Sequence, residues 1–340
     1  MRKTLWSKLC HNWLIKCIGA GVVALGVLSL FSMFYYNPPI HVSCGNGATD
    51  YTRESNKFWS RGTEGFAHGT TDVNGYNNVD GTTQDNVGIL LMGSSQTEGL
   101  YVDAKKNMGY VLNDLLQENG YDMPVYNIGM SSHGFLRTVT NLEAALDTYH
   151  PSDYVVLETD LVDFTSEELD AALNDNLEPL ATYNDGFLYQ MQRIPYVKLV
   201  YQQYQNYKGN QVDSQAFVES AVDDGVYDVQ RVSELLAQIE TEASEHDVTP
   251  IIYYFPHFYL EEDGTLKTSN VDGKISTFAS LCEEHHIIFL DMTDDFLTEY
   301  EQNHHIVSGF SNTKECYGHL NQYGHRLIAQ ALYDAVTQKE

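Results

Sequence analysis

The chain has 340 residues, and its 43% hydrophobic content is ordinary for a globular protein and excludes a largely disordered one. It carries 19 Lys and Arg residues against 47 Asp and Glu residues, which gives a net charge of −28 at pH 7. An acidic surface of this kind repels nucleic acid and anionic lipid, and it argues against both as partners.

The N-terminus predicts a membrane anchor. Residues 1–16 contain four bases and no acid, and residues 17–36 form an uncharged, mostly apolar run of 20 residues. That length spans the hydrocarbon core of a bilayer, and the basic flank is expected to stay in the cytoplasm. A cleaved signal peptide is the alternative, although the apolar run is long and no A-x-A-like site follows it. We therefore expect a cytoplasmic tail at 1–16, a signal anchor at 17–36 and an extracellular remainder.

A polar segment follows the anchor. Residues 37–86 are rich in Gly, Asn, Thr and Asp and are interpreted as a stalk with an irregular lead-in. Four aromatic side chains are expected to hold this segment against the domain that follows: Phe58, Trp59, Phe66 and Tyr76.

From residue 87 to 340 the pattern alternates between strands and helices. Apolar runs predict strands at Val87–Met92, Val125–Ile128, Tyr154–Leu157, Ile251–Phe255 and Ile287–Leu290. Amphipathic periods predict helices at about 104–118, 135–148, 227–245, 272–285 and 322–337. Continuously apolar strands separated by helices indicate an α/β fold: a three-layer, doubly wound sheet of about five parallel strands, with the functional site at the carboxyl ends of the strands.

A helical insertion interrupts this alternation at about residues 165–225. Tyr201, Tyr204 and Tyr207 recur there at every third position. A packing stripe is the ordinary interpretation of this spacing, and a sugar-stacking or lid surface is the alternative.

Cysteines give little information on the compartment. Three cysteines lie beyond the anchor: Cys44, Cys282 and Cys316. Their number is odd and their spacing is not that of zinc ligands, so the sequence allows one disulfide but not a disulfide framework. No metal and no cofactor are expected.

Two motifs at opposite ends of the domain carry the chemistry. The first strand runs into GSSQTEG (93–99), where Ser95 lies on a tight turn that exposes it next to backbone N–H groups. Near the C-terminus, GHLNQYGHRLIA (318–329) places His319 in a loop before the last helix, with Asn321 as the expected N-cap. A serine nucleophile needs such a base within hydrogen-bond reach.

These two blocks resemble the first (GDSxTxG) and last (DxxHLNxxGHxxxA) conserved blocks of the SGNH, or GDSL-like, hydrolase family, which has a flavodoxin-like fold. The resemblance covers about residues 87–337 and implies that Ser95 is the nucleophile and His319 the base. The Gly-Ser-Ser turn behind one N-terminal helix also resembles the D-alanyl transfer and exopolysaccharide O-acetylation proteins, which work beside a membrane-bound O-acyltransferase.

The resemblance is uneven at the oxyanion hole. The block after the second strand, Asn127 to Gly134, puts Ser132 where the family has its oxyanion glycine, with Gly129 in the same turn. The third block puts Asp160 where the family has an asparagine that donates a hydrogen bond. A carboxylate donates only when protonated, so this third donor is in question.

The acid of the triad also departs from the pattern. Cys316 stands three residues before His319, and Ser94 replaces the aspartate of the first block. Glu315 is one position out of register and is the candidate acid, with a Ser–His dyad or an acid from elsewhere as the alternatives. His133, His257 and Glu315 are further candidates for lining the cleft.

Two functions remain open at this point. The first is an extracytoplasmic serine esterase or O-acyltransferase that acts on acyl esters, most simply acetyl esters, of cell-envelope glycans through an acyl-serine intermediate. The second is a non-catalytic module that binds a glycan or a membrane-bound O-acyltransferase partner. A Ser95–His319 hydrogen bond favours the first.

Overall fold

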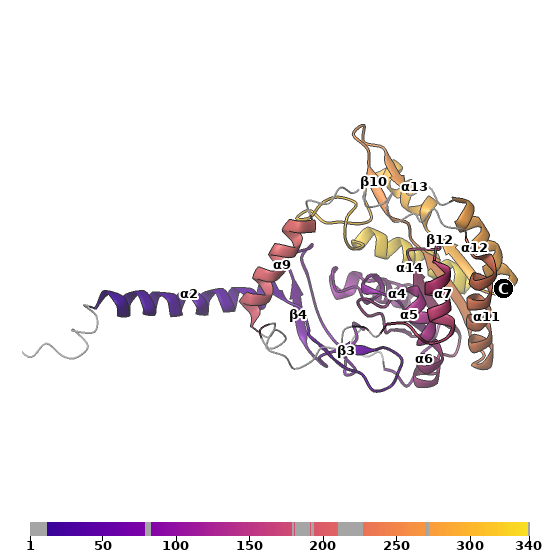
Figure 1. The fold of residues 1–340 in the computed structure, drawn as a ribbon, viewed down its shortest axis with the longest axis horizontal. Helices are drawn as coiled ribbons and strands as arrows, with labels where there is room; N and C mark the ends of the chain where they lie inside the picture. Colours follow the sequence, from indigo (N-terminus) through magenta and orange to yellow (C-terminus); the bar gives the residue numbers. More distant parts are fainter. Residues whose placement is uncertain are drawn as a thin grey trace, which may run out of the picture.

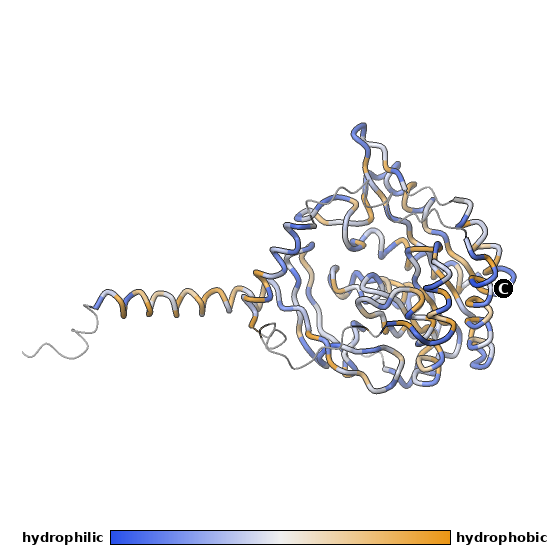
Figure 2. Tube along the Cα trace, viewed as in Figure 1, coloured by the Kyte–Doolittle hydropathy of each residue, from blue (hydrophilic) through white to orange (hydrophobic). Residues whose placement is uncertain are grey.

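The computed structural model describes residues 12–78, 83–178, 180, 191, 194–209, 227–268 and 272–338. One apolar helix, α2 (Trp13–Tyr35), extends away from a rounded domain (Figure 1). In the described part of the chain it is the one helix long and apolar enough to cross a membrane (Figure 2). Its place near the N-terminus fits a membrane anchor or a signal sequence.

A five-stranded parallel sheet forms the centre of the domain, in the order β12-β9-β8-β6-β7. Its strands are β6 (Ile89–Met92), β7 (Val125–Asn127), β8 (Tyr154–Thr159), β9 (Thr249–Tyr254) and β12 (Ile288–Asp291). The five predicted strands are confirmed. The order reverses between β6 and β8, and the crevice beside such a reversal is where ligands bind in open α/β sheets.

Helices cover both faces of the sheet because successive side chains of a strand point to opposite faces. Ile89 and Leu91 of β6 pack into one apolar cluster, whereas Leu90 and Met92 pack into the other. The first cluster includes side chains of α4 (Met108–Glu118), α13 (Thr293–Asn303) and α14 (Gln322–Thr337). The second includes those of α5 (Phe135–Thr140), α6 (Leu142–Tyr149), α7 (Ser166–Leu173), α11 (Val229–Glu245) and α12 (Asp272–Glu284). The predicted three-layer α/β fold is confirmed.

Several smaller elements differ from the prediction. The helix expected at 104–118 divides into a 3-10 turn, η1 (Ala104–Lys106), and α4, and the one expected at 135–148 divides into α5 and α6. α13 and the hairpin of β10 (Phe258–Leu260) and β11 (Leu266–Thr268) were not predicted. Cys17, Cys44, Cys282 and Cys316 are free thiols.

The described part of the predicted insertion is helical, with α7 followed by α9 (Pro195–Gly209). Residues 179, 181–190, 192–193 and 210–226 lie outside the described part. The packing-stripe interpretation of the α9 tyrosines is wrong, since Tyr201, Tyr204 and Tyr207 are 58%, 54% and 66% exposed. α9 lies beside the end of α2 (Figure 1).

The segment predicted as a stalk instead forms two small antiparallel sheets, β1-β4-β5 and β2-β3. Their strands are β1 (Tyr36–Asn37), β2 (His41–Ser43), β3 (Tyr51–Arg53), β4 (Phe58–Arg61) and β5 (Ala67–Thr70). Each has at most four residues and no apolar run, so the hydrophobic pattern does not reveal them. Of the four aromatic residues expected to hold the segment, Trp59 and Tyr76 are buried, whereas Phe58 and Phe66 are exposed.

A buried ion pair joins this N-terminal segment to the parallel-sheet domain. Arg53 Nε and Nη2 of β3 donate to Glu98 Oε1 and Oε2 at 2.6 and 3.0 Å. Burial raises the pKa of Glu98, but the adjacent Arg53 guanidinium outweighs it and holds that pKa below the ordinary 4.5. Because the folded-state pKa is the lower one, this contribution to stability is complete above pH 4.5 and is lost as the pH falls through the folded value.

We expect Arg53→Ala to lower the free energy of unfolding by about 3–5 kcal/mol, because it leaves the buried Glu98 carboxylate without a partner. The measurement is denaturant unfolding of the full chain in detergent, with Arg231→Ala as the control. Arg231 forms an exposed ion pair with Asp170, and its loss leaves the midpoint close to that of the wild type. Equal losses in the two variants would contradict the structural role given to Arg53.

Candidate active site

Ser95 lies at the carboxyl end of β6, in a turn that only glycine lets close. The strand passes through Gly93 and Ser94 into the short helix α3 (Ser95–Glu98). A Cβ on Gly93 would lie 2.4 Å from Thr97 Oγ1. Ser94 Oγ accepts from the N–H of Gln96 at 3.3 Å and so caps α3. The turn therefore presents Ser95 as the first residue of a helix at the rim of the sheet.

A buried carboxylate on the neighbouring strand holds this turn. Glu158 of β8 accepts from the N–H groups of Ser94 and Thr97 at 3.1 and 2.8 Å. It also accepts from the hydroxyls of Ser94, Thr97 and Tyr253. Burial raises the pKa of Glu158, although these donors oppose the shift. Ser94, a predicted cleft residue, thus directs its hydroxyl to Glu158.

His319 reaches Ser95 from the other end of the chain. Its Nε2 lies 3.0 Å from Ser95 Oγ. The following residue, Leu320, donates its N–H to Gln96 Oε1 at 2.8 Å, and Asn321 Oδ1 caps α14 by accepting from Tyr323 N at 2.9 Å. The structure therefore brings the predicted serine and histidine together and confirms the predicted N-cap.

The carboxylate that contacts His319 is Glu64. Its Oε1 lies 2.9 Å from His319 Nδ1 and accepts from the backbone N–H of His319 at 2.9 Å. Burial raises the pKa of Glu64, but the imidazole and its hydrogen bonds outweigh this and bring it below the ordinary value. A carboxylate at Nδ1 fixes the tautomer in which Nε2 accepts the serine proton. Glu315, the acid suggested from the sequence, is exposed on the loop that leads to His319.

Glycine and asparagine make the approach of Glu64 feasible. Gly318 has φ +93°, and a Cβ there would lie 2.4 Å from Glu64 Oε1. Asn312 holds the turn that carries Glu64, because its Oδ1 accepts from Gly65 N at 2.7 Å and its Nδ2 donates to Gly62 O at 2.9 Å. The loop before His319 and the turn of Glu64 therefore position each other.

A stack of flat groups forms one wall of the site. The ring of Tyr101 lies parallel to that of His319, with centroids 3.3 Å apart and an interplanar angle of 10°. Arg61 Cζ lies 3.9 Å from the Tyr101 centroid. Burial raises the pKa of Tyr101 to about 12, so its phenol is neutral at neutral pH. Tyr101 and Arg61 were not identified from the sequence.

The loop after β7 lies against the nucleophile turn, since Met130 N donates to Gly93 O at 2.9 Å. Ser132 has φ +68°, a left-handed conformation that favours glycine. Within the described part of the chain, the N–H groups of Ser95 and Ser132 have no hydrogen-bond acceptor. The N–H of Gly129, in the same turn, donates to Asn127 Oδ1 at 2.8 Å, so it is not available as an oxyanion donor. Gly129 instead allows close packing on α3, where a Cβ would lie 2.5 Å from Glu98 N.

The remaining sequence candidates lie in two other pairs. Asp160 Oδ2 lies 3.2 Å from His257 Nε2, and both side chains are partly exposed beyond the end of β8. His133 is buried, and its Nε2 accepts from Asp50 N at 3.0 Å. His133 therefore links the N-terminal segment to the loop of Ser132 instead of lining the cleft.

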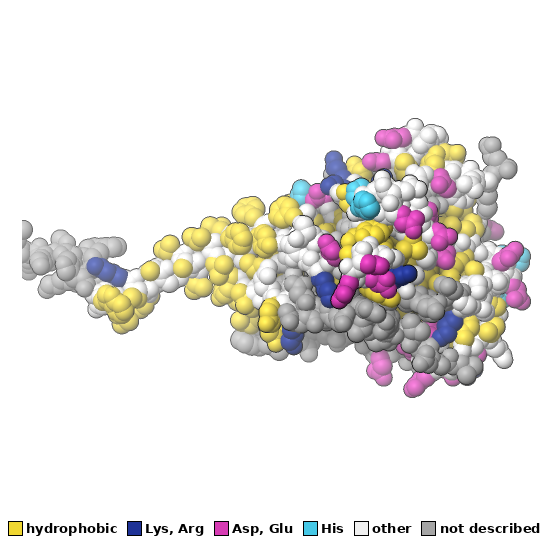
Figure 3. Space-filling view, turned by 90° about the horizontal axis from the view of Figure 1, so that it is seen from above, with side chains coloured by type: hydrophobic (Ala, Val, Ile, Leu, Met, Phe, Trp, Pro, Cys, Tyr) yellow, Lys and Arg dark blue, Asp and Glu magenta, His cyan; other side chains and the backbone are white. Residues whose placement is uncertain are grey.

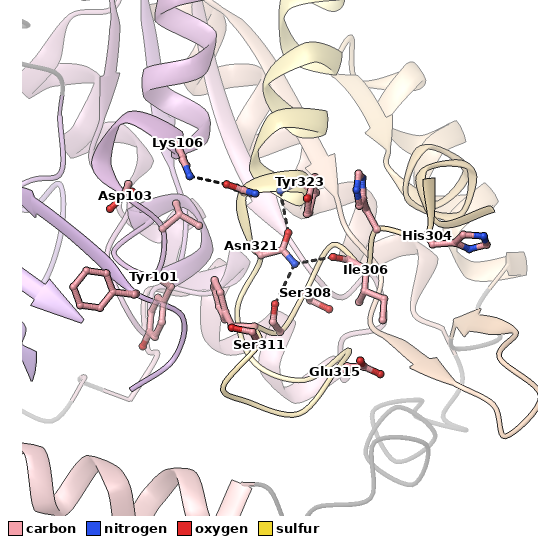
Figure 4. Close-up of a pocket in the computed structure, with 16 residues that line it drawn as sticks. Tyr101, Asp103, Lys106, His304, Ile306, Ser308, Ser311, Glu315, Asn321 and Tyr323 are labelled. Carbon is pink, nitrogen blue, oxygen red and sulfur yellow. Dashed lines mark hydrogen bonds between the residues drawn. The ribbon is translucent and has the colours of Figure 1, made fainter. Parts of the chain in front are cut away.

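A cavity of about 460 Å³ lies beside Tyr101 (Figure 4), and its described lining residues do not include Ser95 or His319. Four of its lining residues are aromatic: Phe66, Tyr101, Phe310 and Tyr323. Asn321 lines the cavity, and its Nδ2 donates to the carbonyls of Ile306 and Gly309 at 2.7 and 3.1 Å. Glu315 lies at this cavity.

Sequence reasoning missed two carboxylates at this site, Glu64 and Glu158. Glu158 falls within the third block, at the position of the family's glycine, and its place at the end of an apolar strand is a signal that could have identified it. Glu64 lies in a polar segment 255 positions from His319, and only the flanking glycines of Gly62-Thr63-Glu64-Gly65 mark a special turn.

No protein-family model matches the chain, and no curated protein matches it. Among solved structures, it resembles the psychrotrophic esterase EstA from Pseudoalteromonas sp., at 15% identity over 75% of this chain and 98% of that one, with a TM-score of 0.39. The acetyl xylan esterase AlAXEase is similar at 12% identity over 73% and 98%, with a TM-score of 0.43. A lipase/acylhydrolase from Enterococcus faecalis is similar at 14% identity over 73% and 94%, with a TM-score of 0.39.

We expect Gly318→Ala to separate Glu64 from His319 and to lower the free energy of unfolding by about 1–2 kcal/mol or more, since the left-handed backbone and the contact with Glu64 both disfavour a Cβ. Gly45→Ala is the control, because a Cβ there meets no atom within 4 Å. Thermal unfolding of the full chain in detergent compares the two variants. A wild-type midpoint for Gly318→Ala would contradict the close approach of Glu64.

Proposed function

We propose that the chain is a membrane-anchored serine esterase or O-acyltransferase that works through an acyl-serine intermediate. The observation that carries this proposal is the continuous relay from Ser95 Oγ to His319 Nε2 at 3.0 Å and from His319 Nδ1 to Glu64 Oε1 at 2.9 Å. Nucleophile, base and orienting acid within hydrogen-bond reach of one another are the arrangement needed to activate a serine hydroxyl.

In the first half-reaction, Ser95 Oγ attacks the carbonyl carbon of an ester while His319 Nε2 takes the serine proton. Glu64 stabilises the imidazolium that forms. The N–H groups of Ser95 and Ser132, which have no other acceptor among the described residues, hold the oxyanion of the tetrahedral intermediate. The intermediate then expels the alcohol, which receives the proton from His319, and an acyl-serine remains.

In the second half-reaction, His319 takes a proton from the incoming hydroxyl as its oxygen attacks the acyl-serine. Water as the nucleophile gives a carboxylic acid and completes an esterase cycle, whereas a sugar hydroxyl gives a new ester and completes a transfer. In both cases the tetrahedral intermediate expels Ser95 Oγ, which regains its proton from His319.

A glycan substrate is proposed because of the aromatic cavity beside Tyr101. Tyr and Phe rings present flat apolar faces, and the side chains of Ser308 and Ser311, which also line the cavity, carry hydroxyls that suit hydrogen bonds to a sugar (Figure 4). We infer that acyl esters of a cell-envelope polymer reach Ser95 across this cavity. The basic tail at 1–16 supports an extracellular position of the domain. A membrane-bound O-acyltransferase as partner stays a prediction from the sequence.

We expect Ser95 to react with a fluorophosphonate probe and Ser95→Ala to lose the adduct, as located by peptide mapping of the full chain in detergent. Glu64→Gln lowers the rates of labelling and of p-nitrophenyl acetate turnover by about 10⁴-fold, because the amide no longer fixes the imidazole tautomer. Glu315→Gln is the matched control and keeps rates close to those of the wild type. A folded wild-type protein without an adduct would favour the non-catalytic binding module, and equal losses in the two glutamine variants would contradict the role of Glu64.

A further inference from the structure

A second cavity, of about 530 Å³, lies between the end of α2, helix α9 and strands β3 and β4. It is separate from the aromatic cavity and shares none of that cavity's described lining residues. Its walls include Tyr36 and Pro38 from the chain directly after α2, Arg53 and Arg61 from the antiparallel sheets, and Lys198 from α9.

The walls of this cavity concentrate positive charge in an otherwise acidic protein. Arg53, Arg61 and Lys198 line it, and no Asp or Glu is found among its described lining residues. The whole chain has 47 acidic residues against 19 Lys and Arg (Figure 3 shows acidic side chains spread over the domain). The local charge of this cavity is therefore positive, whereas the net charge of the whole chain is negative.

The positive charge of this cavity is only partly balanced by protein groups. Glu98 neutralises Arg53 through two hydrogen bonds. Arg61 differs, because its Nε and Nη1 are buried and have no hydrogen-bond partner within the described part of the chain. Lys198 Nζ donates to Pro38 O at 2.9 Å, and burial lowers its pKa to about 8, so it is still largely protonated at neutral pH. Burial lowers the pKa of Arg61, but nearby phenols and carboxylates, Glu98 and Glu64 among them, outweigh it. Two buried N–H donors without acceptors still cost free energy, which a bound anion would reduce.

The position of the cavity points to the membrane surface. Its walls begin one residue after α2 ends at Tyr35. Helix α9, which packs beside that end, exposes Tyr201, Tyr204 and Tyr207. Tyrosine is enriched where a protein meets the headgroup layer of a bilayer. If α2 spans the membrane, the cavity lies at the height of the lipid headgroups.

We propose that this cavity binds the phosphate group of an anionic membrane lipid, with Arg61 and Lys198 as its cationic donors. The inference rests on the membrane anchoring proposed above but not on the esterase chemistry. Arginine forms charge-assisted, two-pronged hydrogen bonds with phosphate, and lysine adds a point charge. The acidity of the whole chain disfavours anionic lipid in general, so binding depends on this local group of cations. A soluble phosphate ester has the same chemistry and is the other source of the ligand.

The test uses the full chain with Ser95→Ala, in detergent, so that binding is measured without turnover. Three probes are titrated calorimetrically: dioctanoyl phosphatidylglycerol, dioctanoylglycerol with the same acyl chains but no phosphate, and glycerol phosphate without acyl chains. We expect saturable binding of phosphatidylglycerol at one site, and none of dioctanoylglycerol. If glycerol phosphate binds more weakly than phosphatidylglycerol, the natural ligand is a lipid. If the two bind equally, the natural ligand is a soluble phosphate ester.

Lys198→Gln is expected to weaken the binding of phosphatidylglycerol about tenfold, since one charge-assisted hydrogen bond is lost. Lys267→Gln is the matched control, because Lys267 lies on the β10–β11 hairpin outside the cavity and its substitution removes the same charge. Arg61→Gln provides a second variant, and thermal unfolding verifies that each is folded. Binding that is equal in wild-type and folded Lys198→Gln and Arg61→Gln proteins, or equal for dioctanoylglycerol and phosphatidylglycerol, would overturn the proposal.

Discussion

The contact between Glu64 and His319 is the interaction on which the proposed chemistry depends. The two residues come from different parts of the molecule, since Glu64 lies on the turn between β4 and β5 and His319 lies on a loop of the parallel-sheet domain. Two residues allow the turn of Glu64 to approach the loop of His319. Gly318 leaves room for the Glu64 carboxylate, and Asn312, on the loop before His319, binds the turn of Glu64 through Gly65 N. The parallel sheet supplies the nucleophile and the base, but the N-terminal segment completes the relay.

Two buried glutamates, Glu158 and Glu98, hold the nucleophile turn and its surroundings in place. Glu158 collects the N–H and hydroxyl donors of Ser94 and Thr97, and Glu98 is paired with Arg53. Ser131 Oγ also donates to Glu98 Oε2 at 2.5 Å, which ties the loop of Ser132 to the same ion pair. Each carboxylate takes its charge-compensating donors from several elements at once, so the serine, the proposed oxyanion donors and the N-terminal segment are positioned together. Such fixed positioning is what makes hydrogen-bond donors effective toward a developing charge.

The N-terminal segment also sets the distance between the apolar helix and the site. Ser60 Oγ donates to Met33 O at 3.3 Å, and a Cβ on Gly62 would lie 2.5 Å from the ring of Tyr35, so the last turn of α2 packs directly on β4 and the turn after it. The same turn carries Glu64. If α2 is the anchor proposed above, the active site lies close to the membrane without a spacer. Arg61 lies between the two regions, since it lines the second cavity and stacks on Tyr101.

The parallel sheet and the Ser95–His319 pair could be predicted because their signals are local. Each strand is an apolar run, and each of the two motifs is a short block with a characteristic spacing. The acid could not be predicted in this way. Glu64 lies in a segment whose strands have only two to four residues, so no hydrophobic pattern marks it. Its contact with His319 arises from tertiary packing, whereas the sequence motif covers only the residues next to His319. Glu315 was the nearest carboxylate in sequence, but it lies exposed on the loop because Cys316, at φ +58°, and Gly318 turn the chain before His319.

A crystal structure of the full chain after reaction with a fluorophosphonate is the most direct test of the Ser95–His319–Glu64 relay. We expect a phosphorus atom bonded to Ser95 Oγ, with a phosphoryl oxygen about 2.7–3.1 Å from the N–H groups of Ser95 and Ser132. We also expect Glu64 to stay on His319 Nδ1 in the adduct. An adduct on another residue, or a His319 that pairs with a different carboxylate while Glu64 faces away, would contradict the proposal that the N-terminal segment completes the active site.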